Sequence, residues 1–225
     1  MSIIEKLLPN VIKYSDKLID STIDTLIMVA ISSVIAIILG LILGVMLVVT
    51  SKGKLYENSR INSVLGKIIN IFRSIPFVII ITLFLPVTKF IVGTSIGIKG
   101  AVVPMIAGIV PFIARQIEQA LSEVDNGVIE AARSMGLSKF YIVHRVLLRE
   151  GMPGIIRALV ISVISLINLS AMAGTVGGGG LGDFAIRYGY AQYMTDITIV
   201  TVMILLIFVS IVQGAGNLYI KHITH

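Results

Sequence analysis

The feature that most constrains this chain is an apolar run without a single charge, TLIMVAISSVIAIILGLILGVMLVVTS, between Asp24 and Lys52. A helix needs about 20 mostly apolar residues to cross the hydrocarbon core of a bilayer. Because no water is available there, the backbone must satisfy its own hydrogen bonds, which a helix does. The run therefore predicts a transmembrane helix.

Composition extends this conclusion to the whole chain, since 56% of its 225 residues are hydrophobic and 13% are charged. Soluble domains usually carry about twice that charged fraction. The apolar runs lack the period-two alternation of barrel strands. We therefore expect an all-α polytopic membrane protein with a single transmembrane domain, 1–225, whose five transmembrane helices cover 22–50, 68–90, 96–118, 153–176 and 196–220.

Two further features modify these spans. The N-terminal segment has no signal-peptide cleavage site and carries apolar residues at helical spacing, at Ile3, Ile4, Leu7, Leu8, Val11 and Ile12. It predicts a short interfacial helix, bent at Pro9, that leads into the first span. Bends are also expected at the prolines inside spans two and three, which are Pro76, Pro86, Pro104 and Pro111.

Lysines and arginines are distributed unequally between the two sides of such a protein. Five spans place the termini on opposite sides, and twelve of the 18 basic residues fall on the side that holds 51–67, 119–152 and the C-terminus. The positive-inside rule makes that side cytoplasmic. We therefore expect the N-terminus outside and the C-terminus in the cytoplasm.

The longest polar stretch spans residues 119–152 and reads QALSEVDNGVIEAARSMGLSKFYIVHRVLLREGM. Asp125 or Asn126 can cap a helix start, and Gly136 can end that helix in a left-handed conformation. Ser138 can cap a second helix, on which Phe140, Val143 and Leu147 share a face. The stretch predicts two short amphipathic helices joined at a glycine.

Two interpretations of this stretch remain open from the pattern alone, a solvated connection or a docking element. Ala131 and Ala132 predict a smooth, narrow helix surface that a groove of another protein can approach closely. Glu130 and Arg133 lie three residues apart and can flank that surface. A helix that served only solubility would not combine small residues with a stop signal so near.

Polar and soft side chains inside the spans are candidates for a translocation path. Asn168 is the only amide of span four, and Ser165 and Ser170 lie near it. Such residues mark functional sites in membrane proteins, although uncharged ones also serve as contacts between helices. Met172 and Met105 could offer a soft wall to a thioether, and ordinary packing is the alternative for both.

Other classes of function find little support. The run GGGGLGD at 177–183 lacks the GK[ST] ending of a P-loop and predicts a flexible external loop rather than an ATP site. The chain has no cysteine and no HExxH pair, so we expect no metal site, no cofactor site and no catalytic residue. A membrane enzyme, a passive channel and a nucleic-acid-binding protein are the alternatives, and none has its usual motif here.

A family resemblance favours the docking interpretation. EAARSMG, followed by KFYIVHRVLLREGMPGII, resembles the "EAA" signature of permease subunits of bacterial ABC importers. The chain is more narrowly similar to methionine-importer permeases in NIFRSIPF (70–77), IVGTSIG (91–97), VPFIARQIEQAL (110–121), SAMAGTVGGGGLG (170–182) and YGY (188–190). One departure is Arg149, which stands where the family usually has proline.

The resemblance implies a type I ABC importer permease in the bacterial cytoplasmic membrane, with 119–152 as its coupling-helix loop. It implies a second copy of the chain, a dimer of ATP-binding cassette ATPases that holds ATP and magnesium, and an external substrate-binding lipoprotein. The coupling signature maps onto Glu130, Ala131, Ala132 and Gly136, beside Arg133. The implied substrate is methionine, with the L-isomer as the first candidate and the D-isomer as the second, and the alternative is another small amino acid or a related substrate. The candidate path residues are Asn168, Ser170 and Met172.

Overall fold

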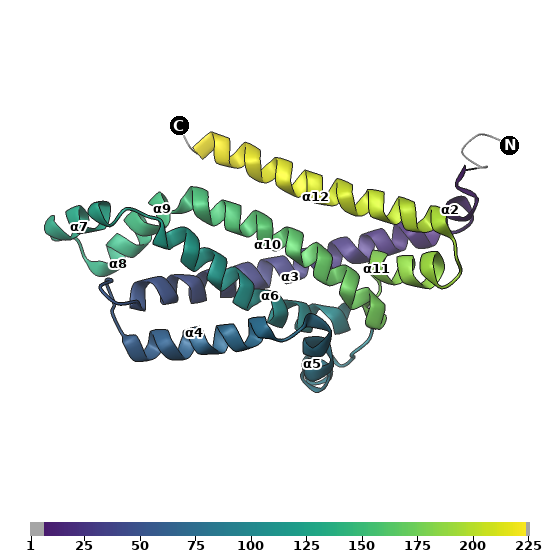
Figure 1. Cartoon of the computed structure of the whole chain (residues 1–225), viewed down its shortest axis with the longest axis horizontal. Helices are drawn as coiled ribbons and strands as arrows, with labels where there is room; N and C mark the ends of the chain where they lie inside the picture. Colours follow the sequence, from purple (N-terminus) through teal and green to yellow (C-terminus); the bar gives the residue numbers. More distant parts are fainter. Residues whose placement is uncertain (1–6, 224–225) are drawn as a thin grey trace. The chain divides into compact units, whose positions relative to one another are not determined.

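The computed structural model describes residues 7–223, and every regular element in that range is a helix. The long helices, shown in Figure 1, are α3 (Ser15–Thr50), α4 (Ser59–Ser74), α5 (Phe77–Val92), α6 (Gly97–Ser122), α10 (Met152–Ala173) and α12 (Thr195–Ile223). The short α-helices are α2 (Pro9–Lys13), α7 (Asn126–Ser134), α8 (Lys139–Tyr141), α9 (Leu148–Glu150) and α11 (Gly180–Phe184). Three segments are π-helical, namely η1 (Ile142–Leu147), η2 (Gly174–Gly178) and η3 (Ala185–Tyr190). The predicted all-α class is confirmed.

Within the described range, α3, α6, α10 together with η2, and α12 are long and apolar enough to cross a membrane. The pair α4 and α5 counts as a fifth span that is broken. The predicted number of spans therefore agrees with the structure. Both α3 and α4 begin earlier than predicted, because their first residues mix charged, polar and apolar side chains and lie outside the continuous apolar runs.

The second span, predicted over 68–90 with a bend at Pro76, is fully broken at that position, where α4 and α5 meet at 108°. The backbone is extended at Ile75 (φ −86°, ψ 126°) and at Pro76 (φ −56°, ψ 138°), so α4 ends at Ser74 and α5 starts at Phe77. Proline lacks an N–H and disfavours a helical conformation at the residue before it. By contrast, Pro86 lies inside α5 without ending it.

The described residues fall into two compact units. The first comprises residues 7–35, 76–107 and 163–213, and the second comprises 36–75, 108–162 and 214–223. The predicted single transmembrane domain stays a prediction. Each of α3, α6, α10 and α12 contributes residues to both units.

In the first unit, the glycine run is packed rather than flexible, which corrects the predicted external loop at 177–183. Gly178, Gly180 and Gly182 are buried, and the backbone N–H of Leu181 donates to Thr25 Oγ1 of α3 at 2.8 Å. A Cβ on Gly182 would lie 2.1 Å from the Ala171 carbonyl oxygen. Glycine is needed here because the backbone approaches its neighbours too closely for any side chain.

The start of the described chain is fastened to the first turn of α12. Pro9 is the first residue of α2, and Leu8 before it is not helical (φ −129°, ψ 49°), so the helical run is interrupted where the bend was predicted. The Asp196 carboxylate accepts hydrogen bonds from the Asn10 N–H (2.9 Å), the Asn10 side-chain amide (3.0 Å) and the Val11 N–H (3.3 Å). Ile3 and Ile4 of the predicted interfacial helix lie outside the described residues.

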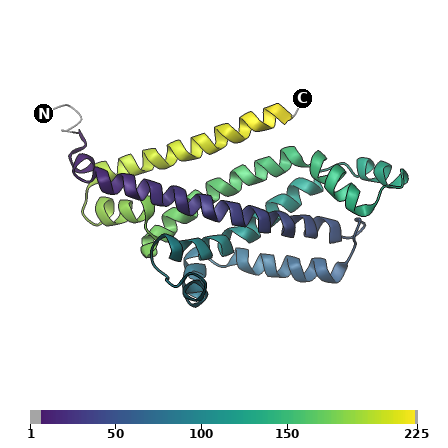
Figure 2. The same ribbon diagram turned by 180° about the vertical axis from the view of Figure 1, so that it is seen from behind.

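In the second unit, α3 and α6 approach each other at Gly40 and Gly44. A Cβ on Gly40 would lie 2.4 Å from Ile113 Cγ2, and one on Gly44 would lie 2.6 Å from Ile117 Cβ. The C-terminal part of α3 runs beside α4, as Figures 1 and 2 both show. A small core joins the three helices through Leu47, Ile69 and Ala114.

A polar link also connects α4 with α6. The guanidinium of Arg115 donates to the Gly66 carbonyl at 3.1 Å and to Asn70 Oδ1 at 3.0 Å, and it forms an ion pair with Glu118. These contacts place the inner end of α6 and the middle of α4 in a fixed register.

Candidate functional site

The polar stretch between α6 and α10 forms a helical hairpin, composed of α7, the turn at Gly136, and the run α8–η1–α9. Asp125 caps α7 by accepting a hydrogen bond from the Gly127 N–H at 2.8 Å. Gly136 has φ +77°, and Ser138 caps the second arm by accepting from the Tyr141 N–H at 3.3 Å. The predicted caps and the glycine turn are confirmed, and we call this element, residues 123–151, the hairpin.

The second arm of the hairpin is not a regular α-helix. Residues Ile142–Leu147 form the π-helical turn η1, which has a wider hydrogen-bond spacing. The buried residues are Ile142 and Leu147, five positions apart, whereas Phe140 is 74% exposed. The prediction that Phe140 shares a face with Leu147 is therefore wrong, because the wide turn changes the register of the helix.

The structure corrects the role expected of Ala132. Ala132 is only 2% exposed and packs in a cluster with Leu55 and Ile142. It cannot form part of a surface that another protein approaches, because its methyl group already touches the chain's own interior. A small residue is needed here because α7 lies against the turn between α3 and α4.

Leu55 is the residue of this site that the sequence analysis missed. It lies in the turn 51–58, is buried, and supplies the side chain against which Ala132 packs. The only available signal was a lone leucine in the polar sequence SKGKLYEN. The turn is held in place by hydrogen bonds from the Tyr56 N–H to the Val49 carbonyl and from the Asn58 N–H to the Thr50 carbonyl, both 2.9 Å.

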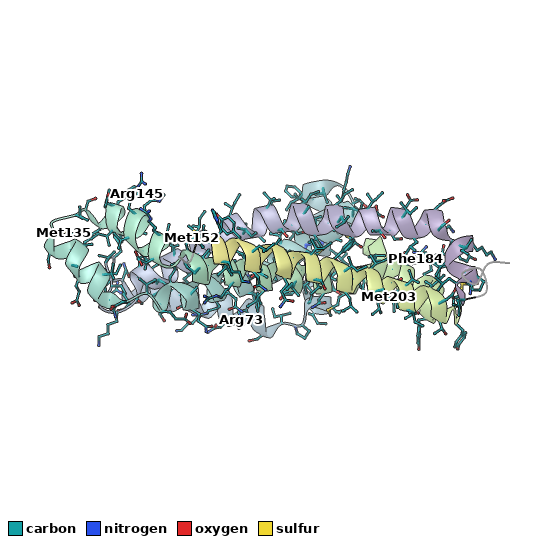
Figure 3. All side chains as sticks on the ribbon, turned by 90° about the horizontal axis from the view of Figure 1, so that it is seen from above. Arg73, Met135, Arg145, Met152, Phe184 and Met203 are labelled. Atoms are coloured by element: carbon teal, nitrogen blue, oxygen red, sulfur yellow. The ribbon has the colours of Figure 1, made fainter. Side chains whose placement is uncertain are left out.

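The opposite surface of the hairpin is open. Ala131 and Gly136 are exposed, and beside them Met135 is 71% exposed. Phe140 stacks on the His144 ring with the ring planes 10° apart. Figure 3 labels Met135 at the turn between α7 and α8 and Arg145 on the second arm. This surface combines apolar side chains with basic ones, which suits contact with another protein.

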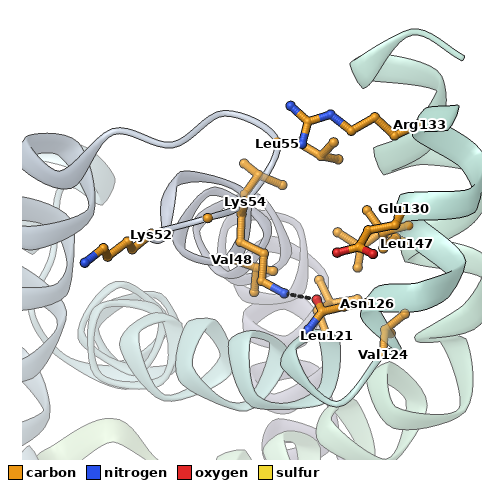
Figure 4. Close-up of a pocket in the computed structure, with 13 residues that line it drawn as sticks. Val48, Lys52, Lys54, Leu55, Leu121, Val124, Asn126, Glu130, Arg133 and Leu147 are labelled. Atoms are coloured by element: carbon orange, nitrogen blue, oxygen red, sulfur yellow. Dashed lines mark hydrogen bonds between the residues drawn. The ribbon is translucent and has the colours of Figure 1, made fainter. Parts of the chain in front are cut away.

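A pocket of about 280 Å³ separates the turn 51–58 from α7 (Figure 4). Glu130 and Arg133 both line it, so these two residues of the signature border the pocket as well as the Ala131 surface. Lys54 Nζ donates a hydrogen bond to Asn126 Oδ1, which joins the turn to the start of α7. The pocket floor is apolar and includes Val48, Val49, Leu121, Val124, Ile129 and Leu147.

The candidate path residues are only partly brought together. Asn168 and Met172 lie four residues apart on α10 and are both exposed, so they share an open helix face. Ser170 is buried, and its hydroxyl donates to the Ile167 carbonyl at 2.7 Å. Met105 is completely buried. The structure thus groups Asn168 with Met172 and separates them from Ser170 and Met105.

Among residues 7–223, no three histidine, aspartate or glutamate side chains converge in a way that could hold a metal ion. The described part of the hairpin offers packing surfaces and hydrogen-bonding groups.

Comparison with known proteins gives consistent matches over most of the chain. The family model described as "Binding-protein-dependent transport system inner membrane component" matches residues 36–215. The probable D-methionine transport system permease protein MetI of Vibrio cholerae is 48% identical, over 80% of this chain and 80% of that protein. The methionine import system permease protein MetP of Bacillus subtilis is 47% identical, over 76% of this chain and 78% of that protein.

The fold is also similar to solved structures. An inward-facing structure of the MetNI methionine ABC transporter matches with a TM-score of 0.92 and 40% identity, covering 95% of this chain and 99% of the matched one. An amino acid ABC transporter matches with a TM-score of 0.78 at 21% identity, over 96% of this chain and 98% of that chain. At that identity the second likeness concerns the fold alone.

Proposed function

The chain belongs to the family of binding-protein-dependent transport system inner membrane components, and on that premise we propose that it is the permease subunit of an ATP-driven methionine importer. The observation that carries the proposal is the match, at a TM-score of 0.92, to the permease fold of a methionine ABC transporter over 95% of the chain. The names of the relatives from Vibrio cholerae and Bacillus subtilis support methionine as the substrate.

In this proposal the hairpin is the part of the permease that contacts the ATPase subunits. Two ATPase subunits, which bind ATP and magnesium, contact the permease pair at the open surface around Ala131, Met135 and Gly136. The hairpin can transmit their movement because it is packed as a unit, with Ala132 buried against Leu55 and Ile142. It connects α6 directly to α10, so a displacement of the hairpin acts on two spans at once.

The proposed orientation follows from charge. The hairpin and the turn 51–58 belong to the side that holds twelve of the 18 lysines and arginines, and they therefore lie on the cytoplasmic side of the cell membrane. The N-terminus lies outside, where a substrate-binding lipoprotein delivers the amino acid.

The proposed translocation path includes the face of α10 that carries Asn168 and Met172. An amide on an open face of a spanning helix is costly against lipid, and it is stabilised where a second subunit or water covers it. The second copy of the chain supplies that cover. Ser170 adds no free hydroxyl to this face, since its O–H is bonded within the helix.

The test is uptake by the reconstituted system. Proteoliposomes that contain the chain, its ATPase and its binding lipoprotein should accumulate labelled L-methionine only with internal ATP. Unlabelled L-methionine, D-methionine, leucine and glutamine are then added as competitors. Failure to accumulate labelled L-methionine, together with ATP-dependent accumulation of labelled leucine or glutamine, would assign another small amino acid, and ATP-independent flux would contradict an importer.

A further inference from the structure

A basic groove of about 600 Å³ lies between the turn 51–58, the start of α4 and the hairpin. Three cationic side chains line it, Lys54, Arg133 and Lys139, against one carboxylate, Glu57. The Glu57 carboxylate accepts a hydrogen bond from the Gly53 N–H at 2.9 Å within its own turn. None of the three cations forms an ion pair among the described residues, and the Lys54 ammonium donates one hydrogen bond to Asn126 Oδ1 at the neighbouring pocket. The groove therefore carries positive charge that the described chain does not neutralise.

The positions of these cations are set by the fold. The Lys139 ammonium lies 5.4 Å from the centre of the Tyr56 ring. Asn58 also lines the groove and caps α4 by accepting from the Ile61 N–H at 3.1 Å. The positive end of the α4 dipole thus opens into the same groove and adds to its attraction for an anion.

A second groove, of about 340 Å³, lies next to the first. The two share Ile61, and the second is otherwise apolar except for Arg60 at its edge. Val64 and Ile68 of α4 form its wall and are about half exposed. A basic groove and an apolar groove that meet at one residue match the two parts of a phospholipid, a charged headgroup and an acyl chain.

We propose that these joined grooves bind one anionic phospholipid. Its phosphate lies among Lys54, Arg133 and Lys139, and an acyl chain follows Ile61 and Val64. A soluble phosphate compound would leave the apolar groove empty, and a zwitterionic lipid would gain less from three unpaired cations. Because Arg133 and Lys139 belong to the hairpin and Lys54 to the turn 51–58, the lipid bridges the two. This site goes beyond the transport function and does not depend on the substrate.

The charge arm of the test uses native mass spectrometry of the intact permease–ATPase complex, titrated with phosphatidylglycerol. The groove variant Lys54→Gln/Lys139→Gln is compared with Lys89→Gln/Lys99→Gln, which removes the same charge from exposed lysines of other helices. We expect the groove variant to weaken lipid binding about tenfold or more and the control pair to leave it within about twofold.

The acyl arm compares two exposed apolar residues of α4. Val64→Asn alters the apolar groove, whereas Ile71→Asn changes a side chain of similar exposure that does not line it. We expect weaker lipid binding only for Val64→Asn. Lys139→Gln alone serves in place of the double variant if the latter fails to assemble with the ATPase.

Four results would overturn the proposal. These are equal losses in groove and control variants, no saturable phosphatidylglycerol binding, phosphatidylcholine binding of equal strength, and displacement of the lipid by millimolar inorganic phosphate. The last would assign the basic groove to a free phosphate group. No uptake is measured, so a negative result leaves the transport proposal intact.

Discussion

The methyl group of Ala132 packs against Leu55, so α7 is held in place by the turn between α3 and α4. Its neighbour Ala131 is exposed on the opposite side of the same helix. The two alanines of the signature therefore have different tasks. Ala132 packs in the core of the hairpin, and Ala131 keeps the exposed surface of α7 free of a large side chain.

This division predicts opposite outcomes for the same substitution. Ala132→Leu should destabilise the permease by about 1–3 kcal/mol, because the extra carbons overfill the cluster with Leu55 and Ile142. Ala131→Leu should leave the melting temperature unchanged. Thermal denaturation of both purified variants measures the difference, and equal melting temperatures would show that Ala132 is not confined.

The open surface of the hairpin should carry the contact with the ATPase. Met135→Asp places a charge where an apolar side chain is 71% exposed, so stability should change little. Affinity for the ATPase should fall about tenfold or more if Met135 enters the contact. Ser122→Asp, at the exposed end of α6, is the control. Binding is measured by surface plasmon resonance, and unchanged affinity of the Met135 variant would remove this surface from the interface.

Helices α3 and α6 lie so close together at Gly40 that we expect any side chain at this position to reduce stability. Gly40→Ala would bring its Cβ to 2.4 Å from Ile113, so we expect a loss of about 1–3 kcal/mol. Gly214→Ala, in α12, is the matched control, because no heavy atom lies within 4 Å of its added Cβ. Alanine is the better helix former there and should be neutral or slightly stabilising. A similar loss of stability in both would mean that the close approach is absent.

The link between α2 and α12 depends on a single carboxylate. Asp196→Ala removes the acceptor of three hydrogen bonds from Asn10 and Val11. Hydrogen exchange at these two backbone amides should then become at least about tenfold faster. Asp183→Ala is the comparison, because its ion pair with the exposed Arg187 is worth little. Unaltered exchange in the Asp196 variant would contradict the observed anchoring.

The open face of α10 should affect transport more than stability. Asn168→Leu removes an exposed amide, so the melting temperature should not fall, whereas ATP-driven uptake should decrease several-fold. Ser170→Ala changes a buried hydroxyl bonded within the helix and should reduce uptake much less. If the serine variant is the more impaired of the two, the path follows another face.

Several features of this protein could be predicted because they depend on neighbouring residues. A charge-free run specifies a span through the cost of burying polar groups in lipid, which is why α3 was predictable. Asp125, Gly136 and Ser138 act on backbone groups within three residues of themselves, so the hairpin followed from its sequence. The break before Pro76 has an equally local cause, although its full effect on the second span was not predicted.

Other features depend on residues far away in the chain. Whether Ala132 faces inward is decided by Leu55, 77 positions earlier, and no periodicity within α7 indicates that contact. The glycines at 178–182 suggested a loop, yet they serve close packing, because Thr25 of α3 binds the Leu181 N–H. The π-helical turn η1 shifted the buried face of the second arm, and hydrophobic patterns that assume 3.6 residues per turn do not anticipate such a shift.

The contacts of Arg115 also bear on how this protein can move. One guanidinium joins the Gly66 carbonyl and the Asn70 side chain of α4 to the inner part of α6. Sliding one helix along the other would break both bonds and leave the guanidinium with Glu118 of α6 as its remaining acceptor. The two segments must therefore move together, so in the proposed mechanism a displacement of α6 also displaces α4 and acts over a wider cross-section of the membrane.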